Sequence, residues 1–385
     1  MRERDDLPFS MAEYRSRLER TRAAMDEAEV ALLMSSTPEN IYYLTGFNSR
    51  GYYSHQCLFV PRHGEPWMVV RQLDEPNVSL HTWLEAADSY RDADDPIAAT
   101  VRSIRERDLG SAVVGLELSS WFLTAHTHIR LRDLLPEATF KDASGMIERL
   151  RIIKSPAEVE YTRQAGLAVA AGMRAAIDET REGALDSDVA AAAYRARILA
   201  GSEYVASPVY VQTGPGSAIP HNNWNGRRIA RGDVTFYEMG ASVRRYHCSL
   251  MRTSVVGAPS KDVARAGAAV VDGLEAALQA IRPKVSAGEV DAACRDLIKR
   301  AGFADNHTLR VGYHIGIGYP PTWVGRGVFG LNRGAPDLLE PGMVFHVIPW
   351  IHVPGVGGFG NSATVVVTDA GYEKLAELES ALFVR

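Results

Sequence analysis

Ionisable side chains gather in the segment 221–252, which reads as two strands joined by a turn. Glu238 ends an apolar run, a turn is expected at the Gly-Ala pair 240–241, and the second strand carries His247. A β-hairpin delivers alternate side chains to one face of a sheet. We therefore place the candidate active site here, with Glu238, His221 and His247 as its catalytic residues.

A carboxylate and two imidazoles are groups suited to general acid–base or nucleophilic catalysis. Glu238 would attack an electrophilic carbon or take a proton from a water that does so. The alternative is a glutamate that only pairs with Arg245 or Arg252. An imidazole can accept and return a proton near neutral pH, which suits His221 and His247 as proton shuttles. The alternative for these histidines is hydrogen bonding within a loop or within the core.

The composition is that of an ordinary globular protein, with 385 residues, 46% of them hydrophobic and 23% charged, and a formal net charge of −5. The chain has neither a strongly basic character nor a long apolar stretch, so we expect neither nucleic acid nor a membrane as a partner. The charged N-terminal segment lacks the apolar core of a signal peptide, which predicts a cytoplasmic protein. Cys57, Cys248 and Cys294 lie far apart, which predicts neither a disulfide framework nor a thiolate zinc site.

Residues 1–153 alternate between helical and strand-like patterns, which predicts a small α/β domain. Helices are expected at 10–28 and 119–135, and strands at 30–34, 57–60, 67–70, 112–116 and 148–153. Ser155, Pro156 and Glu158 then form the pattern of a capped helix start. We place the domain boundary just before this helix, which gives domains 1–153 and 154–385.

The second domain repeats a pattern of two helices next to β-rich sequence. The expected helix pairs are 156–179 with 188–199 and 264–281 with 290–300, and Gly183 and Gly288 separate their members. This spacing indicates an internal duplication with two similar halves that face one another.

Several blocks, in this order, resemble the peptidase M24 family, whose fold is called pita-bread and whose members include methionine aminopeptidases, proline dipeptidases and creatinase. The blocks are 40–46, RIIKSPAEVE at 151–160, 238–252, 311–321 and 341–346. The resemblance implies an α+β chain, with a creatinase-like N-terminal α/β domain followed by a pita-bread catalytic domain of internal pseudo-two-fold symmetry. It also implies a homodimer in which the loop 48–55 of one subunit approaches the active site of its partner.

The metallopeptidases of this family bind two metal ions on two aspartates, one histidine and two glutamates. Four of the five matching positions here are neither acidic nor imidazole; the five are Glu238, Ser249, Tyr313, Ile348 and Ser362, or Asn361 if the register slips by one. A dinuclear site needs several anionic or imidazole ligands to hold two dications against water. We therefore expect no metal and no other cofactor.

The chain is most similar to the ectoine hydrolases, metal-free members of the family, in the segments 238–248, 312–323 and 341–346. It departs from them at 360–362, Gly-Asn-Ser, where those enzymes keep a glutamate. The resemblance implies a metal-independent hydrolase that opens a small zwitterionic cyclic amidine, ectoine, at a C–N bond to give N-acetylated diaminobutyrate. One alternative is a creatinase-like amidinohydrolase or another metal-free C–N hydrolase or lyase. The other is a non-catalytic protein of this fold that binds a ligand.

A protonated amidine would pair with the Glu238 carboxylate through two parallel charge-assisted hydrogen bonds. For each substrate contact the alternative is plain packing. A flat cation also attracts aromatic faces, and a substrate carboxylate needs a cation or backbone N–H groups, for which Arg326 and Arg333 are the candidates. The predicted substrate-binding residues are Tyr52 and Trp323 for stacking, Tyr313 for a hydrogen bond, His346 in the space of a lost metal, and His314 and Arg326.

Overall fold

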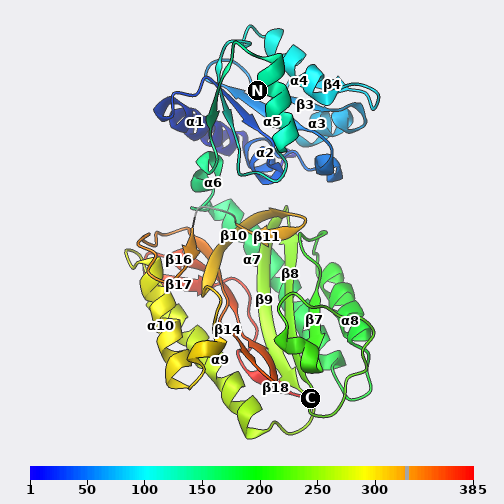
Figure 1. Ribbon diagram of the computed structural model, residues 1–385, viewed down its shortest axis with the longest axis vertical. Coiled ribbons are helices and arrows are strands. Elements are labelled where there is room, and N and C mark those ends of the chain that lie inside the picture. The colour runs from blue at the N-terminus through cyan, green and yellow to red at the C-terminus, as the bar shows by residue number, and fades with distance from the viewer. Residues whose placement is uncertain (326–328) are drawn as a thin grey trace. The chain divides into compact units, whose positions relative to one another are not determined.

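The computed structural model describes residues 1–325 and 329–385. The chain divides into two compact units, Met1–Arg151 and Ile152–Arg385 (Figure 1). Each unit has a sheet and helices of its own. No helix in the described part of the chain combines the length and the apolar character that a membrane span requires.

The first unit is built on a six-stranded mixed sheet in the order β4-β3-β2-β1-β5-β6. The strands β1, β2 and β3 are largely apolar and buried, which is why the short run Cys57–Pro61 forms β2, whereas the edge strands β4 and β6 are more polar and more exposed. The strands are β1 Leu32–Ser35, β2 Cys57–Pro61, β3 Trp67–Arg71, β4 Ala87–Tyr90, β5 Val113–Leu116 and β6 Thr139–Asp142. The helices are α1 Met11–Glu27, α2 Pro38–Thr45, α3 Glu75–His81, α4 Pro96–Arg105, α5 Ala125–Leu134 and α6 Met146–Leu150.

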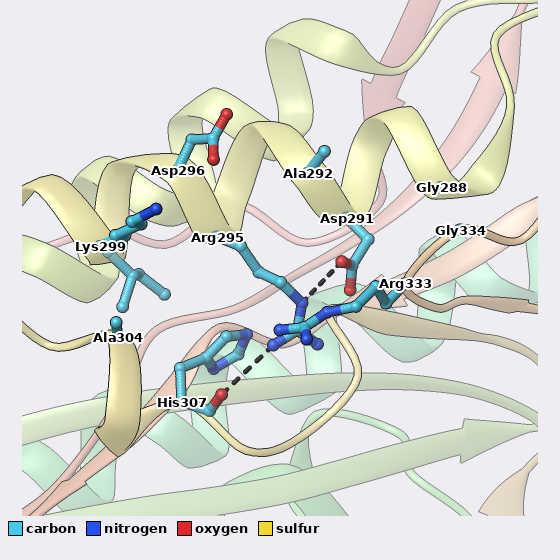
Figure 2. Close-up of a pocket in the computed structure, with 11 residues that line it drawn as sticks. Gly288, Asp291, Ala292, Arg295, Asp296, Lys299, Ala304, His307, Arg333 and Gly334 are labelled. Carbon is cyan, nitrogen blue, oxygen red and sulfur yellow. Dashed lines mark hydrogen bonds and ion pairs between the residues drawn. The ribbon is translucent and has the colours of Figure 1, made fainter.

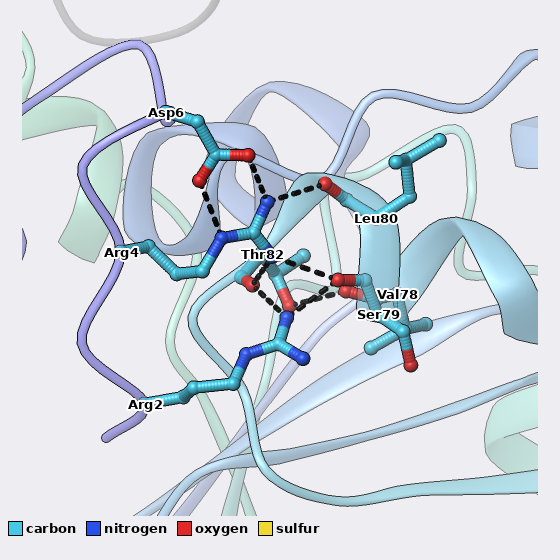
Figure 3. Close-up of polar contacts among 7 residues, drawn as sticks. All are labelled: Arg2, Arg4, Asp6, Val78, Ser79, Leu80 and Thr82. Atoms are coloured by element: carbon cyan, nitrogen blue, oxygen red, sulfur yellow. Dashed lines mark hydrogen bonds and ion pairs between the residues drawn. The ribbon is translucent and has the colours of Figure 1, made fainter.

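Two arginines of the N-terminal arm hold the end of helix α3 (Figure 3). Arg2 Nη2 donates to the carbonyl of Thr82 at 2.8 Å, and Arg4 donates to the carbonyls of Ser79 at 2.9 Å and Leu80 at 3.0 Å. The last carbonyls of a helix have no partner within it, and cations near them interact favourably with the negative end of the helix dipole. The arm is therefore fixed to the first unit by charge-assisted hydrogen bonds.

The second unit contains a ten-stranded sheet whose main path is β17-β16-β13-β10-β9-β8-β7. Figure 1 shows α9 and α10 on one side of it and α8 on the other. The helices are α7 Pro156–Glu179, α8 Asp186–Leu199, α9 Lys261–Ala280 and α10 Ala287–Arg300. The strands are β7 Tyr210–Thr213, β8 Val234–Val243, β9 Tyr246–Val255, β10 Gly312–Tyr319, β11 Thr322–Val324, β12 Gly330–Leu331, β13 Val344–Val347, β14 Trp350–Val353, β15 Gly357–Gly360, β16 Ala363–Thr368, β17 Gly371–Lys374 and β18 Leu382–Val384.

Two helix pairs and two hydrophobic clusters match the expected duplication. One cluster packs α7 and α8 against β8 and β9, and the other packs α9 and α10 against β13 and β16. The side chain of Ser155 accepts from the backbone N–H of Glu158 and the Glu158 side chain accepts from the N–H of Ser155, so the predicted capping box is present. Ser286 and Glu289 repeat it at α10.

The turn of the β8–β9 hairpin lies at Arg244 and Arg245, so the prediction of a turn at 240–241 was wrong. Both arginines have positive φ, 47° and 64°, as a two-residue hairpin loop of type I′ requires. The Glu203 carboxylate accepts their backbone N–H groups at 3.0 and 3.4 Å, which stabilises a conformation unusual for arginine.

Two other predictions in the first unit need correction. The segment 148–153 does not form a strand, because α6 runs to Leu150 and its end turns at Arg151. The helix expected at 119–135 begins only at Ala125, after Thr124, whose side chain caps it by accepting from the N–H of Thr127. In both cases a capping interaction set the boundary, rather than the apolar pattern.

Candidate active site

Glu238 lies in the middle of β8, between Tyr210 of β7 and Met251 of β9. Its side chain is partly exposed, and no residue of the described ranges gives it a hydrogen bond or an ion pair. The loss of water around the carboxylate raises its pKa from the usual 4.5 to about 7. The group is therefore poised to gain or lose a proton near neutral pH.

The ring of Trp323 lies over the strand beside Glu238. Gly240 is two residues along β8 and so shares the face of Glu238. A Cβ at Gly240 would come within 3.1 Å of the Trp323 ring, so the glycine allows this close approach. Trp323 is buried in β11, and its Nε1 donates to Tyr313 Oη at 3.0 Å.

Tyr313, His346 and Ser362 form a buried hydrogen-bonded chain. Tyr313 Oη lies 2.8 Å from His346 Nδ1, and His346 Nε2 lies 2.8 Å from Ser362 Oγ. Ser362 Oγ also accepts the backbone N–H of Met251 at 2.6 Å, which fixes the chain to the strand that pairs with Glu238. Burial, and then the nearby charge of Glu238, raise the pKa of Tyr313, which places this phenol close to the carboxylate.

The hydrogens in this chain follow from the charge of His346. Burial, and then the charge of Arg252, lower the pKa of His346 to about 3, so the ring is neutral and carries one N–H. If that hydrogen is on Nδ1, Tyr313 Oη accepts from both His346 and Trp323, and its own O–H is left to donate elsewhere. If it is on Nε2, Tyr313 must donate to His346. The tautomer thus decides where the phenol hydrogen points.

His221 lies next to Tyr210, the residue that pairs with Glu238 across the sheet. It is exposed, adopts a positive φ of 59°, and its ring lies 6.4 Å from the ring of Tyr210, the direct neighbour of Glu238 across the sheet. Within the described residues His221 and Glu238 make no hydrogen bond or ion pair with each other. Its side chain is therefore accessible to water and close to the face that carries the carboxylate.

Both ring nitrogens of His247 make hydrogen bonds to the backbone. Nε2 accepts the backbone N–H of Ala206 at 3.1 Å, and Nδ1 lies 2.9 Å from the carbonyl of Arg245, to which it must donate. The ring is fully buried, and burial holds its pKa well below the ordinary value. The predicted catalytic role of His247 stays a prediction, but this geometry is that of the alternative, a histidine satisfied within the core.

Of the other predicted substrate contacts, His314 lies apart from this cluster, and the structure does not place Tyr52 or Arg326 relative to it. His314 follows Tyr313 in β10 and points the other way, with Nδ1 3.1 Å from the carbonyl of Phe329. Tyr52 belongs to the first unit, where its hydroxyl accepts from Arg50 at 2.7 Å. Arg326 lies outside the described residues.

Arg310 is a candidate that the sequence did not reveal. Its guanidinium lies 4.8 Å from the centre of the Tyr313 ring, and the residue is exposed and has no ion pair within the described chain. No motif marks it, because it stands in a loop three residues before Tyr313 and reaches the cluster only through the fold. Its charge is available to a carboxylate bound over Tyr313.

Neither arginine that offered a simpler explanation of Glu238 contacts it. Arg245 donates to the carbonyls of Tyr204 and Gly318, and Arg252 donates to the carbonyls of Glu379 and Leu378. Arg252 is one residue from the partner of Glu238 in the register and so points to the opposite face.

The donor set around Glu238 does not fit a pair of metal ions. His346 uses both ring nitrogens in the chain described above, and Ser249 Oγ donates to the carbonyl of Met239 at 2.9 Å. Within the described residues no three histidine, cysteine, aspartate or glutamate side chains converge on one point. Among the residues that the structure describes, Glu238 is thus the single anionic ligand on this face, too few for two dications.

Comparison with known proteins identifies both units. Residues 17–153 match the creatinase/prolidase N-terminal domain, and residues 160–369 match metallopeptidase family M24. Ectoine hydrolase of Halomonas elongata is 32% identical over 98% of this chain and 99% of its own. The probable dipeptidase PepE of Mycobacterium tuberculosis is 30% identical over 94% of each chain.

Solved structures share the fold of this chain. Dipeptidase PepE from Mycobacterium ulcerans superposes with a TM-score of 0.82 at 28% identity, covering 98% of this chain and 99% of that one. A prolidase from Thermococcus sibiricus gives 0.88 at 24% identity, with 98% of this chain and 100% of that one covered, and so shows the fold alone. The predicted family and the predicted fold class are confirmed.

Proposed function

This chain belongs to peptidase family M24, a family of hydrolases, and from that premise we propose that it is a metal-independent C–N hydrolase acting on a small zwitterionic cyclic amidine, ectoine being the candidate substrate. One observation carries the proposal: the Glu238 carboxylate has a pKa near 7 and no counter-ion among the described residues, at a position that resembles a metal ligand of the metallopeptidases. The similarity to an ectoine hydrolase over nearly the whole chain supports the choice of substrate.

A cationic amidine complements this face. Its two N–H groups would meet the two oxygens of Glu238 and neutralise a charge that water no longer solvates fully. The Trp323 ring packs over Gly240, two residues along the strand from Glu238, and an indole attracts a flat cation. The guanidinium of Arg310, over the Tyr313 ring, would take the substrate carboxylate.

Hydrolysis then needs one base. Glu238 takes a proton from water as the water oxygen bonds to the amidinium carbon, which gives a neutral tetrahedral adduct. As one C–N bond breaks, the departing nitrogen takes the proton from Glu238. The Glu238 carboxylate then accepts the hydroxyl proton as the carbonyl forms and passes it to the departed amine. An amide and an ammonium ion result, and Glu238 is again ionised. A pKa near 7 suits a base that works at neutral pH.

Tyr313 and His221 would assist Glu238 in the reaction. Tyr313 can donate its O–H to the adduct when His346 carries its hydrogen on Nδ1, since two donors then already point at the phenol oxygen. His221 is exposed and can exchange protons between Glu238 and solvent. Direct attack by Glu238 on the amidinium carbon remains the alternative, and the contacts of Tyr52, His314 and Arg326 with substrate and the homodimer stay predictions.

The reaction class is tested with a substrate panel. Chelator-treated protein is incubated with ectoine, hydroxyectoine, creatine and a proline dipeptide, and the products are read by mass spectrometry. We expect ring opening of ectoine without added metal, because the donor set around Glu238 does not support a metal pair. Turnover of the dipeptide only after manganese or cobalt is added would overturn the proposal, and turnover of creatine alone would favour the amidinohydrolase.

Replacing the proposed base by its neutral isostere, Glu238→Gln, is expected to lower kcat by about 10²–10⁴-fold, the usual contribution of a general base. The melting temperature should not fall, because Glu238 makes no hydrogen bond or ion pair to lose within the described residues. Steady-state kinetics and thermal unfolding check both. A variant that keeps most of the wild-type rate would show that Glu238 is not the catalytic carboxylate.

The pH dependence provides a second check on the same group. A base must be ionised, so kcat/KM should rise with pH and level off above an apparent pKa of about 7. The folded state binds a proton on Glu238 between 4.5 and about 7 that the unfolded state has released, so this carboxyl makes stability fall as pH rises through that window. Glu238→Gln should remove this fall, and a flat rate profile through neutrality contradicts the assignment.

Two replacements of His346 separate its two nitrogens. An asparagine can place an N–H near the position of Nδ1 and still donate to Tyr313, whereas a glutamine reaches the position of Nε2 and keeps only Ser362. If the Nδ1–H tautomer orients the phenol, H346N should retain about tenfold more kcat than H346Q, with similar KM, which corresponds to about 1.4 kcal/mol. Equal rates in two folded variants would remove His346 from the mechanism.

A further inference from the structure

The ring of His247 packs against the indole of Trp323. The two ring centres lie 6.3 Å apart with an interplanar angle of 31°, and both side chains are buried. Gly318 of β10 leaves room for this contact, because a Cβ there would lie 2.9 Å from Trp323 Cα and 3.1 Å from the His247 ring. A glycine is therefore required where the histidine and the tryptophan meet.

The register of the β8–β9 hairpin places His247 on the face that carries Glu238. His247 pairs with Ser242 across the hairpin, and register partners project to the same face. Ser242, Gly240 and Glu238 also share this face, because alternate residues of a strand do so. The Trp323 ring lies over Gly240, within 3.1 Å of the position of a Cβ. Along the strand, the indole thus has the carboxylate on one side and the His247 ring on the other.

Two backbone groups hold the His247 ring in this orientation. Its Nε2 accepts the N–H of Ala206 at 3.1 Å, and its Nδ1 donates to the carbonyl of Arg245, 2.9 Å away. A rotation of the ring would break these bonds and leave buried backbone groups unpaired, which is costly. Both nitrogens are therefore committed, and the ring presents a fixed face to the indole.

The indole needs such a second contact to fix its plane. Its hydrogen bond to Tyr313 Oη holds Nε1, on the five-membered ring. The atoms nearest to Gly240 are Cε3 and Cζ3, on the six-membered ring. A single hydrogen bond lets the indole swing about the bonded edge, whereas a rigid neighbour packed against the ring restricts that swing.

We propose that His247 is a positioning residue, whose fixed ring keeps the Trp323 indole over Gly240, two residues along β8 from Glu238. This role replaces the proton shuttling predicted for His247 from the sequence. The ring acts on the substrate only through Trp323. Its effect on substrate binding rests on the proposed function, but its packing against the indole does not depend on what the substrate is.

Fluorine NMR of protein labelled with fluorotryptophan tests the packing without any substrate. The Trp323 resonance is assigned by its loss in W323F. H247N can keep the bond to the Arg245 carbonyl and H247Q the bond from the Ala206 N–H, while both remove the ring. We expect the Trp323 resonance to shift by more than its linewidth in both variants. A resonance that stays in place, or that moves in only one folded variant, contradicts the proposal.

G318A gives the same test with the imidazole in place. The added methyl group would press on both Trp323 and His247 and force them apart, so the Trp323 resonance should shift again. This variant decides the matter if the loss of the imidazole prevents folding. An unchanged resonance in folded G318A would show that the contact does not set the position of the indole.

H307N is the matched control. His307 is also buried, and its Nδ1 donates to the Trp350 carbonyl at 2.8 Å, a bond that an asparagine can keep. Figure 2 shows His307 beside helix α10, where Arg295 donates to its carbonyl at 3.2 Å. Within the described residues His307 has no ring contact with Trp323, so H307N should leave the Trp323 resonance in place. A shift as large as that in H247N would show that the loss of any buried histidine moves it, and the proposal would fail.

Kinetics with ectoine show how the ring affects the reaction. H247Q should raise KM about tenfold and leave kcat unchanged, because the indole that attracts the cation is displaced while Glu238 stays in place. The kcat/KM profile should keep its apparent pKa of about 7, since His247 exchanges no proton in this role. A lower kcat together with a changed pH profile would restore the proton shuttle and refute the positioning role.

A double-mutant cycle tests whether His247 acts through Trp323. In W323F the ring has no indole to position, so adding H247Q should not raise KM further. A further rise of about tenfold in the double variant would mean that His247 contacts the substrate itself, against the proposal. If the wild-type protein turns over no ectoine, the proposed function has failed, whereas the fluorine spectra still decide the role of the ring.

Discussion

A carboxylate partly withdrawn from water without a counter-ion is the constraint around which the second unit is arranged. Glu238 sits in the middle of a long strand, paired with Tyr210 on one side and Met251 on the other, and no described residue gives its carboxylate a hydrogen bond or an ion pair. Desolvation alone raises its pKa to about 7. An ionised carboxylate in this state is stabilised by a cation that reaches it, because the cation replaces the lost solvation.

The described polar side chains around Glu238 leave its charge unpaired because they form hydrogen bonds with each other or with the backbone. Ser249 turns its hydroxyl to the carbonyl of Met239, and His346 is held between Tyr313 and Ser362. At the positions that resemble metal ligands, neutral hydrogen-bonding groups thus replace anions. The result is one charge surrounded by neutral partners, where two dications would need several charges. A singly charged organic substrate matches this distribution.

Local patterns predicted the elements well where local interactions determine them. The capping box at Ser155 and Glu158 and the paired helices after it follow from short-range chemistry. Glu238, Tyr313, Trp323 and His346 were named from the sequence, through the family resemblance, and the structure brings them together.

Long-range contacts account for most of what the sequence did not reveal. The hairpin turn falls on two arginines because Glu203, some forty residues earlier, accepts their N–H groups. His247 loses its free nitrogen to the backbone of Ala206. Arg310 reaches Tyr313 only through the path of a loop. No spacing rule encodes such partners, since each depends on where a distant segment lies in the folded unit.

The duplication explains why the cluster forms at this point of the sheet. Glu238 comes from the hairpin of the first half, and Tyr313 and His346 come from the strands of the second. The two halves meet narrowly, with Ile317 and Tyr246 as the register pair between β10 and β9. Trp323 lies across this junction, over Gly240 on one side and bonded to Tyr313 on the other.

Trp323 is therefore one of the links between Glu238 and Tyr313, together with the hydrogen bond from the Met251 N–H to Ser362 Oγ. A smaller side chain at Trp323 would remove both the contact over Gly240 and the hydrogen bond to the Tyr313 hydroxyl. The position of the Tyr313 phenol relative to the Glu238 carboxylate is thus a property of the junction between the two halves, because it depends on contacts that each half makes with the other.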